Sequence, residues 1–159
     1  MDGKVFVRDG RRIVCFERYL KHPVEKVWEA ITRPDQLAQW LTVKSELDLN
    51  VDGQLVLRWD NGDEVTGKFT KVEAPYELEY TWLESSSGNS VVRWMLKEEG
   101  DGCMLQLMHT FPESVAVIDF LSGWYVHLDV LDTVLHERFT GFPDGRVKEM
   151  RKRYASMMS

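Results

Sequence analysis

Residues 115–139 read VAVIDFLSGWYVHLDVLDTVLHERF, and the remainder of the chain is interpreted from this segment. Its apolar residues recur every three or four positions, which predicts one continuous stripe along an amphipathic α-helix. The stripe consists of Val117, Leu121, Trp124, Leu128, Leu131, Leu135 and Phe139. Ser114 is a suitable N-cap residue, and Gly141 followed by Pro143 is typical of a helix end. A stripe of this length requires a large apolar partner surface.

The segments before this helix predict that partner surface, because most of them alternate as half-buried strands do. The expected strands cover residues 13–20, 47–51, 54–59, 64–72, 78–82, 92–96 and 103–110. Two short helices are expected to begin at Pro23 and Pro34. The strands precede the long helix instead of alternating with it. The fold class is therefore α+β, with a curved antiparallel sheet around the long helix and a gap beside it for a ligand.

Two residues inside the expected strands are unusual. Gly67 lies between Val65 and Phe69, and a glycine in a strand indicates a bulge, a bend or a close backbone approach. Arg18 shares its strand face with apolar neighbours by period two. We expect its guanidinium on the core side, paired with a carboxylate. The alternative is a polar anchor for a ligand.

Composition restricts the possible functions. A chain of 159 residues fits one domain, and a net charge of −6 argues against a nucleic-acid-binding surface. Cys15 and Cys103 are interpreted as free thiols in a reducing compartment. The start lacks the pattern of a signal peptide, and no apolar run approaches the roughly 18 residues of a membrane span. We therefore expect a cytoplasmic protein. The basic residues 144–159 are interpreted as a solvated tail, with a docking segment for an anionic partner as the alternative.

Sequence motifs for catalysis are absent. The four histidines show no close ligand spacing, so we expect no metal site. No nucleophile elbow, phosphate loop or dinucleotide fingerprint occurs, so we expect no cofactor. The histidines are His22, His109, His127 and His136.

Aromatic side chains are the stronger functional signal, because many fall on inward strand faces. Any single tryptophan is more often part of a core, but several together indicate a cavity with an apolar wall and a few polar tips. The candidate cavity residues are Trp40, Trp59, Phe69, Tyr80, Trp82, Trp94, His109, Trp124 and Leu128. His109, at the end of a strand, is a core histidine in the ordinary interpretation and a catalytic base in the alternative.

The chain also resembles a known family. The opening resemblance is carried by Glu17-Arg18, His22-Pro23, Glu25, Val27-Trp28, Ala30, Thr32, Pro34, Leu37 and Trp40-Leu41. Later matches are Gly67, Ala74-Pro75, Leu78-Glu79-Tyr80-Thr81-Trp82, Gly102, Leu105 to His109, and Gly123-Trp124 with Leu128 and Leu131. Over residues 11–140 they resemble the START-like (SRPBCC) superfamily, in its bacterial branch similar to the activator of heat-shock-protein-ninety ATPase. The chain departs from the family pattern at Ala74, usually a proline, and at Cys103, commonly a threonine.

The resemblance implies a helix-grip fold with an internal apolar cavity, in a single domain over residues 1–159. The favoured hypothesis is non-enzymatic binding or carriage of a small apolar ligand, which could be lipid-, flavonoid- or polyketide-like. A chaperone-linked, stress-response interaction module is the first alternative. A cyclase or lyase is the second, and it would need an acid/base pair in the cavity.

Overall fold

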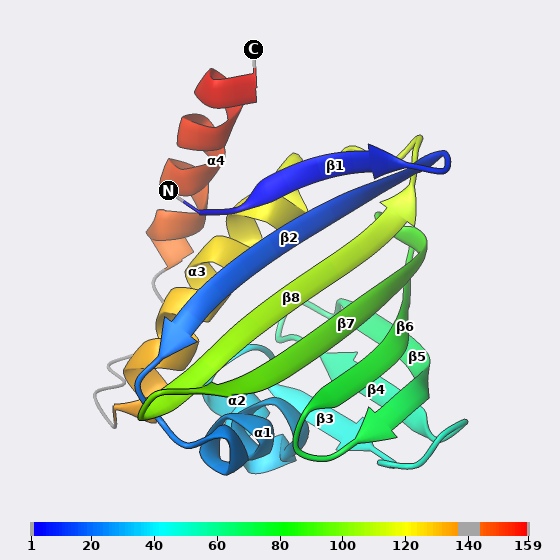
Figure 1. The fold of residues 1–159 in the computed structure, drawn as a ribbon. Coiled ribbons are helices and arrows are strands. Elements are labelled where there is room, and N and C mark those ends of the chain that lie inside the picture. Colours follow the sequence, from blue (N-terminus) through cyan, green and yellow to red (C-terminus); the bar gives the residue numbers. More distant parts are fainter. Residues whose placement is uncertain (1, 137–143, 159) are drawn as a thin grey trace.

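A curved, open antiparallel sheet lies along one side of the long helix in the computed structural model, which describes residues 2–136 and 144–158 (Figure 1). The strands are β1 Lys4–Arg8, β2 Arg11–Leu20, β3 Lys44–Leu47, β4 Gln54–Arg58, β5 Glu64–Glu73, β6 Glu77–Glu84, β7 Gly88–Glu99 and β8 Gly102–Pro112. The helices are α1 Val24–Thr32, α2 Pro34–Trp40, α3 Ile118–Leu135 and α4 Asp144–Met158.

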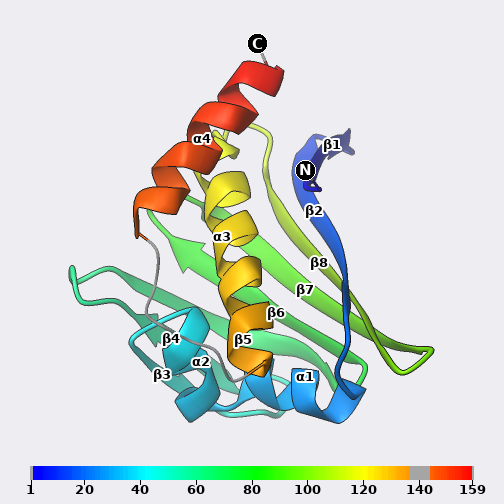
Figure 2. The same ribbon diagram turned by 90° about the vertical axis from the view of Figure 1, so that its left-hand side faces the viewer.

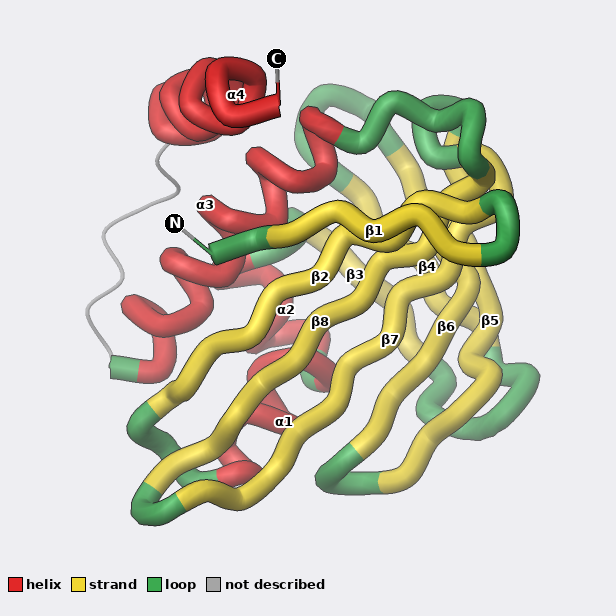
Figure 3. The backbone as a smooth tube through the Cα atoms, turned by 45° about the horizontal axis from the view of Figure 1, so that its top comes forward, coloured by secondary structure: helices red, strands yellow, loops and turns green. Residues whose placement is uncertain are grey.

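Within the described residues the sheet has eight strands in the order β1-β2-β8-β7-β6-β5-β4-β3, and every neighbouring pair is antiparallel. Figure 3 follows the neighbouring strands, and Figure 2 shows the helices on the concave side with α3 crossing it. Strands β3 to β8 form a meander, and β2 pairs with β8 along ten residue pairs from Arg11↔Pro112 to Leu20↔Cys103. The predicted α+β helix-grip architecture is confirmed.

The predicted apolar stripe anchors α3 in the core. Val117, Leu121, Trp124, Leu128, Leu131 and Leu135 are all buried. Phe139, Gly141 and Pro143 lie outside the described residues. The prediction of Ser114 as N-cap is wrong, because α3 follows Val117 and Ser114 lies in the turn that leaves β8. That turn includes a hydrogen bond from the Val115 N–H to the Pro112 carbonyl at 3.1 Å.

The expectation of a solvated C-terminal tail is also wrong. Residues 144–158 form α4, which packs on α3 and buries Met150 and Tyr154. The Tyr154 hydroxyl donates a hydrogen bond to the Asp2 carbonyl at 2.6 Å. Val147 lies three residues before Met150, so the apolar spacing is helical even though basic residues dominate the segment.

Two strand predictions have different outcomes. The strand expected at residues 47–51 instead runs from Lys44 to Leu47, because the following residues turn, with Asp52 in the left-handed region at φ 69°. The close approach expected at Gly67 is confirmed. A Cβ atom there would lie 1.8 Å from the Thr81 carbonyl oxygen, and the β5–β6 register shifts just beyond it.

Both cysteines are free thiols. No described helix is long and apolar enough to cross a membrane.

Candidate functional site

A hollow of about 220 Å³ opens beside the first half of α3, close to the β4–β5 turn. Its apolar lining consists of Leu41, Trp59, Trp82, Phe120 and Trp124, with Gly123 on the helix. Its polar lining consists of Asn61, Asp63, Glu84, Asp119 and His127. The hollow therefore has an aromatic wall and several groups that can hydrogen-bond.

A second hollow, of about 560 Å³, continues over α2 and the segment after it. It shares four residues with the first hollow: Leu41, Trp59, Asn61 and His127. Trp40 and Thr42 also line it. The two hollows therefore meet along one wall, and a bound molecule could extend from one into the other.

The tryptophans form a connected cluster below the first hollow. The ring centroid of Trp82 lies 5.6 Å from that of Trp124 and 6.3 Å from that of Trp59. The Trp59 indole N–H donates to the Leu41 carbonyl at 2.9 Å. The Trp82 indole N–H is buried and has no hydrogen-bond partner among the described residues. A buried donor without a partner is costly, so this indole stands out in the wall of the hollow.

His109 sits beneath this wall, fully buried, in a chain of hydrogen bonds. The Trp124 indole N–H donates to His109 Nδ1 at 3.0 Å, and an indole can only donate. His109 therefore carries its proton on Nε2 and donates it to Ser90 Oγ at 2.8 Å, and Ser90 donates to the Trp82 carbonyl at 2.7 Å. Burial lowers the pKa of His109 well below its ordinary value. Both ring nitrogens of this neutral imidazole are thus used inside the core.

His127 is the histidine that reaches the hollow. Its Nδ1–H donates to the Trp40 carbonyl at 2.7 Å, which fixes the tautomer. Burial lowers the pKa of His127 to about 4, although the hydrogen bond to that carbonyl opposes the change. At neutral pH the hollow therefore contains a neutral imidazole beside the carboxyl groups of Asp63, Glu84 and Asp119.

The structure distributes the sequence-predicted cavity residues over two regions. Trp59, Trp82 and Trp124 line the first hollow, and Trp40 lines the second. The others line neither of these hollows and pack in the core: Phe69, Tyr80, Trp94, His109 and Leu128. Tyr80 accepts a hydrogen bond from the Trp94 indole, and burial raises the pKa of its hydroxyl. Sequence reasoning missed His127, although it follows Trp124 by three residues on the same helix.

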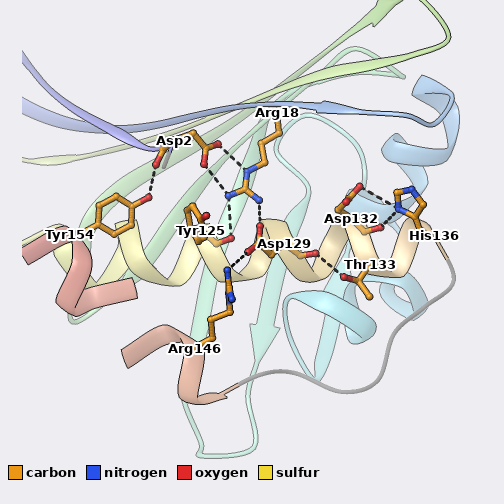
Figure 4. Close-up of polar contacts among 9 residues, drawn as sticks. All are labelled: Asp2, Arg18, Tyr125, Asp129, Asp132, Thr133, His136, Arg146 and Tyr154. Atoms are coloured by element: carbon orange, nitrogen blue, oxygen red, sulfur yellow. Dashed lines mark hydrogen bonds and ion pairs between the residues drawn. The ribbon is translucent and has the colours of Figure 1, made fainter. Parts of the chain in front are cut away.

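Arg18 is paired with carboxylates, as expected, but at a distance from both hollows. Its Nε lies 3.0 Å from Asp2 Oδ2, and its Nη1 lies 2.5 Å from Asp129 Oδ1 on α3 (Figure 4). Arg146 on α4 contacts the other oxygen of Asp129 at 3.3 Å. The Arg18 guanidinium also lies 4.7 Å from the Tyr125 ring centroid. These contacts connect the N-terminus, β2, α3 and α4.

Comparison with known proteins defines the family. Residues 21–136 match the family model described as Activator of Hsp90 ATPase homolog 1-like protein. No curated protein matches the chain. Similar solved structures include CalU16 from Micromonospora echinospora, with 23% identity, 97% of this chain and 94% of that chain covered, and a TM-score of 0.77. A conserved protein of unknown function from Enterococcus faecalis has 19% identity, 98% and 90% coverage, and a TM-score of 0.81.

DynU16, called a putative protein in the dynemicin biosynthetic locus, has 23% identity and a TM-score of 0.72. That match covers 81% of this chain but 48% of DynU16. Identities this low establish the shared fold, while the match over residues 21–136 establishes the family. The chain belongs to the family of proteins similar to the activator of Hsp90 ATPase homolog 1.

Proposed function

We propose that the protein binds a small, largely apolar aromatic molecule in the hollow beside α3, without transforming it. The observation that carries this proposal is the convergence of Trp59, Trp82 and Trp124 on one wall. Aromatic walls with a few polar groups are the usual chemistry of a small-molecule pocket. The carboxyl groups and amide of the polar lining, together with His127, would orient a hydroxyl or carbonyl on the ligand.

The size of the hollow restricts the ligand class. Pockets for drug-sized molecules usually measure about 300–1,000 Å³, so about 220 Å³ favours a ligand of one or two rings over a sterol or a long fatty acid. A larger ligand, such as a flavonoid, would need the adjoining hollow as well. Each Å² of apolar surface buried contributes about 25 cal/mol before the cost of association, so a Kd on the order of micromolar is expected.

The unpartnered Trp82 N–H supports an adaptable pocket. This atom is covered in the structure, so a ligand oxygen reaches it only if the ring turns toward the hollow. Such a turn would give the indole the acceptor that it lacks and would change its fluorescence. DynU16 shares the fold and is assigned by name to a biosynthetic locus, which favours a small molecule over a chaperone as the partner.

The test combines thermal unfolding and tryptophan fluorescence with four probes: 1-naphthol, a flavonoid, palmitate and cholesterol. Binding to the folded state raises the melting temperature by mass action, and a ring against Trp59 or Trp124 changes the emission. We expect 1-naphthol to change both signals and cholesterol to change neither. If none of the four probes changes either signal, and a chaperone pulled down from a lysate stabilises the protein instead, the proposal is wrong.

Gly123 offers a variant that separates binding from folding. It lies inside α3 on the hollow, and a Cβ atom there meets nothing within 4 Å. Gly123→Leu should therefore fill the hollow and weaken 1-naphthol binding at least tenfold. The same change should stabilise the free protein by about 1 kcal/mol, because glycine is a poor helix former.

The matched control is Gly145→Ala on α4, where a Cβ atom is equally unhindered and the residue does not line the hollow. This variant should keep the wild-type affinity for 1-naphthol. Equal affinities for Gly123→Leu and the wild type would show that the probe binds elsewhere.

A further inference from the structure

We infer a second site, for a divalent transition-metal ion, at the opposite end of α3. One ligand atom from each of His22, Asp132 and His136 lies within 4.8 Å of those of the other two. His22 and His136 are 114 residues apart, so no local spacing in the sequence indicates this cluster. Two imidazoles and one carboxylate are a common ligand set for zinc and neighbouring metals, and an unsuitable one for magnesium or calcium.

The local structure brings the three side chains together. His22 lies in the connection between β2 and α1, where its backbone N–H donates to the Leu20 carbonyl at 2.8 Å. Asp132 lies in the last turn of α3, and His136 is the C-cap residue of that helix (Figure 4). The C-terminal end of a helix carries partial negative charge, which favours a cation.

Two of the three ligand-atom separations are close to those of a tetrahedral zinc site, and the third, between His22 and Asp132, is below 4.8 Å. Two ligands about 2.05 Å from zinc in tetrahedral directions lie about 3.3 Å apart, whereas adjacent octahedral ligands lie about 2.9 Å apart. His22 Nε2 and His136 Nδ1 are separated by 3.4 Å, and His136 Nδ1 and Asp132 Oδ1 by 3.5 Å. Both separations agree with the tetrahedral value, and three protein ligands leave a fourth position for water.

Binding requires one proton to move. In the metal-free protein His136 Nδ1–H donates to the Asp132 carbonyl at 2.8 Å. A metal needs the lone pair of this nitrogen, so the ring turns away from that carbonyl, the hydrogen bond is given up and the ring proton is held on Nε2. Lys26 opposes binding, because its ammonium, held 2.8 Å from the Leu135 carbonyl, also acts electrostatically on His22 and would repel a cation there.

This site is separate from the aromatic hollow. Asp132 follows His127, the last α3 residue that lines either hollow, by five residues, which is about 7.5 Å along the helix axis, and none of the three metal ligands lines a hollow. A failure to bind metal would therefore leave the proposal of a ligand in the hollow intact, and a failure to bind ligand would leave the proposal of a metal site intact. A bound ion would join the β2–α1 connection to the end of α3.

The test uses zinc chloride with the full chain, free of any histidine tag and treated with a chelator. Isothermal titration should give one zinc ion per chain, and cobalt(II) in place of zinc should give the absorption spectrum of a tetrahedral site. His22→Gln, Asp132→Asn and His136→Gln should each weaken zinc binding at least tenfold, because even partners outside the first coordination sphere change affinity by about 10–100-fold. Lys26→Gln should strengthen it.

Matched controls are Lys21→Gln, beside His22 in the sequence, and Asp35→Asn, on α2. Both should retain the wild-type affinity, and all variants should keep the wild-type circular dichroism spectrum. His109 and His127 are present in every variant, so zinc held by those residues would persist. The proposal is overturned if the His22 and His136 variants bind zinc within threefold of the wild type, or if the wild type binds none.

Discussion

Replacing His127 tests whether buried neutral histidines make the fold sensitive to acid. Burial lowers the pKa of His127 to about 4 in the folded protein, against roughly 6.5 in an unfolded chain. Between these values the unfolded chain binds the extra proton, so the free energy of unfolding falls as the pH falls from 6.5 toward 4. One such histidine lowers the free energy of unfolding by about 2 kcal/mol between pH 7 and pH 5, and partial solvent access to the ring makes this loss smaller.

His127→Gln should remove that contribution while retaining an N–H group for the Trp40 carbonyl. The assay is urea unfolding of both proteins at pH 7, 6, 5.5 and 5, with the free energy of unfolding plotted against pH. The variant curve should be flatter than the wild-type curve by up to about 2 kcal/mol over this range. His109 should still contribute a slope of the same sign, because burial lowers its pKa as well. Parallel curves would refute the argument, since they would mean that His127 titrates alike in both states.

Three further substitutions test the fold. Leu131→Ala should lower the free energy of unfolding by about 3–5 kcal/mol, because Leu131 is fully buried on the stripe of α3; a loss below about 0.5 kcal/mol would place that face in solvent. Gly67→Ala should cost about 3 kcal/mol, because the Thr81 carbonyl must move, and wild-type stability would contradict the close approach. Arg18→Met should cost about 1–3 kcal/mol, since Asp129 keeps its contact with Arg146; no loss in urea unfolding would show that the ion pairs contribute nothing.

The fold was predictable from the sequence because its main signals are local. The spacing of Leu121, Leu128 and Leu135 specifies a helix and its buried face without knowledge of any partner. The ends of elements were less predictable, because they depend on tertiary geometry. The residues after Pro112 are needed for the turn out of β8, so Ser114 cannot cap α3 despite its suitable side chain.

The candidate sites were less predictable because they depend on contacts between distant segments. The alternation of apolar and polar residues predicts that Trp82 and Trp94 both lie on the inward faces of their strands. The position of α3, however, leaves Trp82 at the hollow and Trp94 in the core. His109 likewise cannot be assigned from its strand face alone. Only its partners Trp124 and Ser90 show that both ring nitrogens are occupied.

The polar face of α3 shows the same dependence. Tyr125, Asp129, Asp132 and His136 recur at spacings of four, three and four, which places them along one face of the helix. A sequence argument assigns Asp129 and Asp132 to solvent, because they lie off the apolar stripe. In the structure Asp129 instead contacts Arg18, which is 111 residues away, and Asp132 lies near the His22 side chain. A carboxylate that lies off the apolar stripe is therefore not necessarily solvated, because the tertiary fold can bring a cation or an imidazole to the same face of the helix.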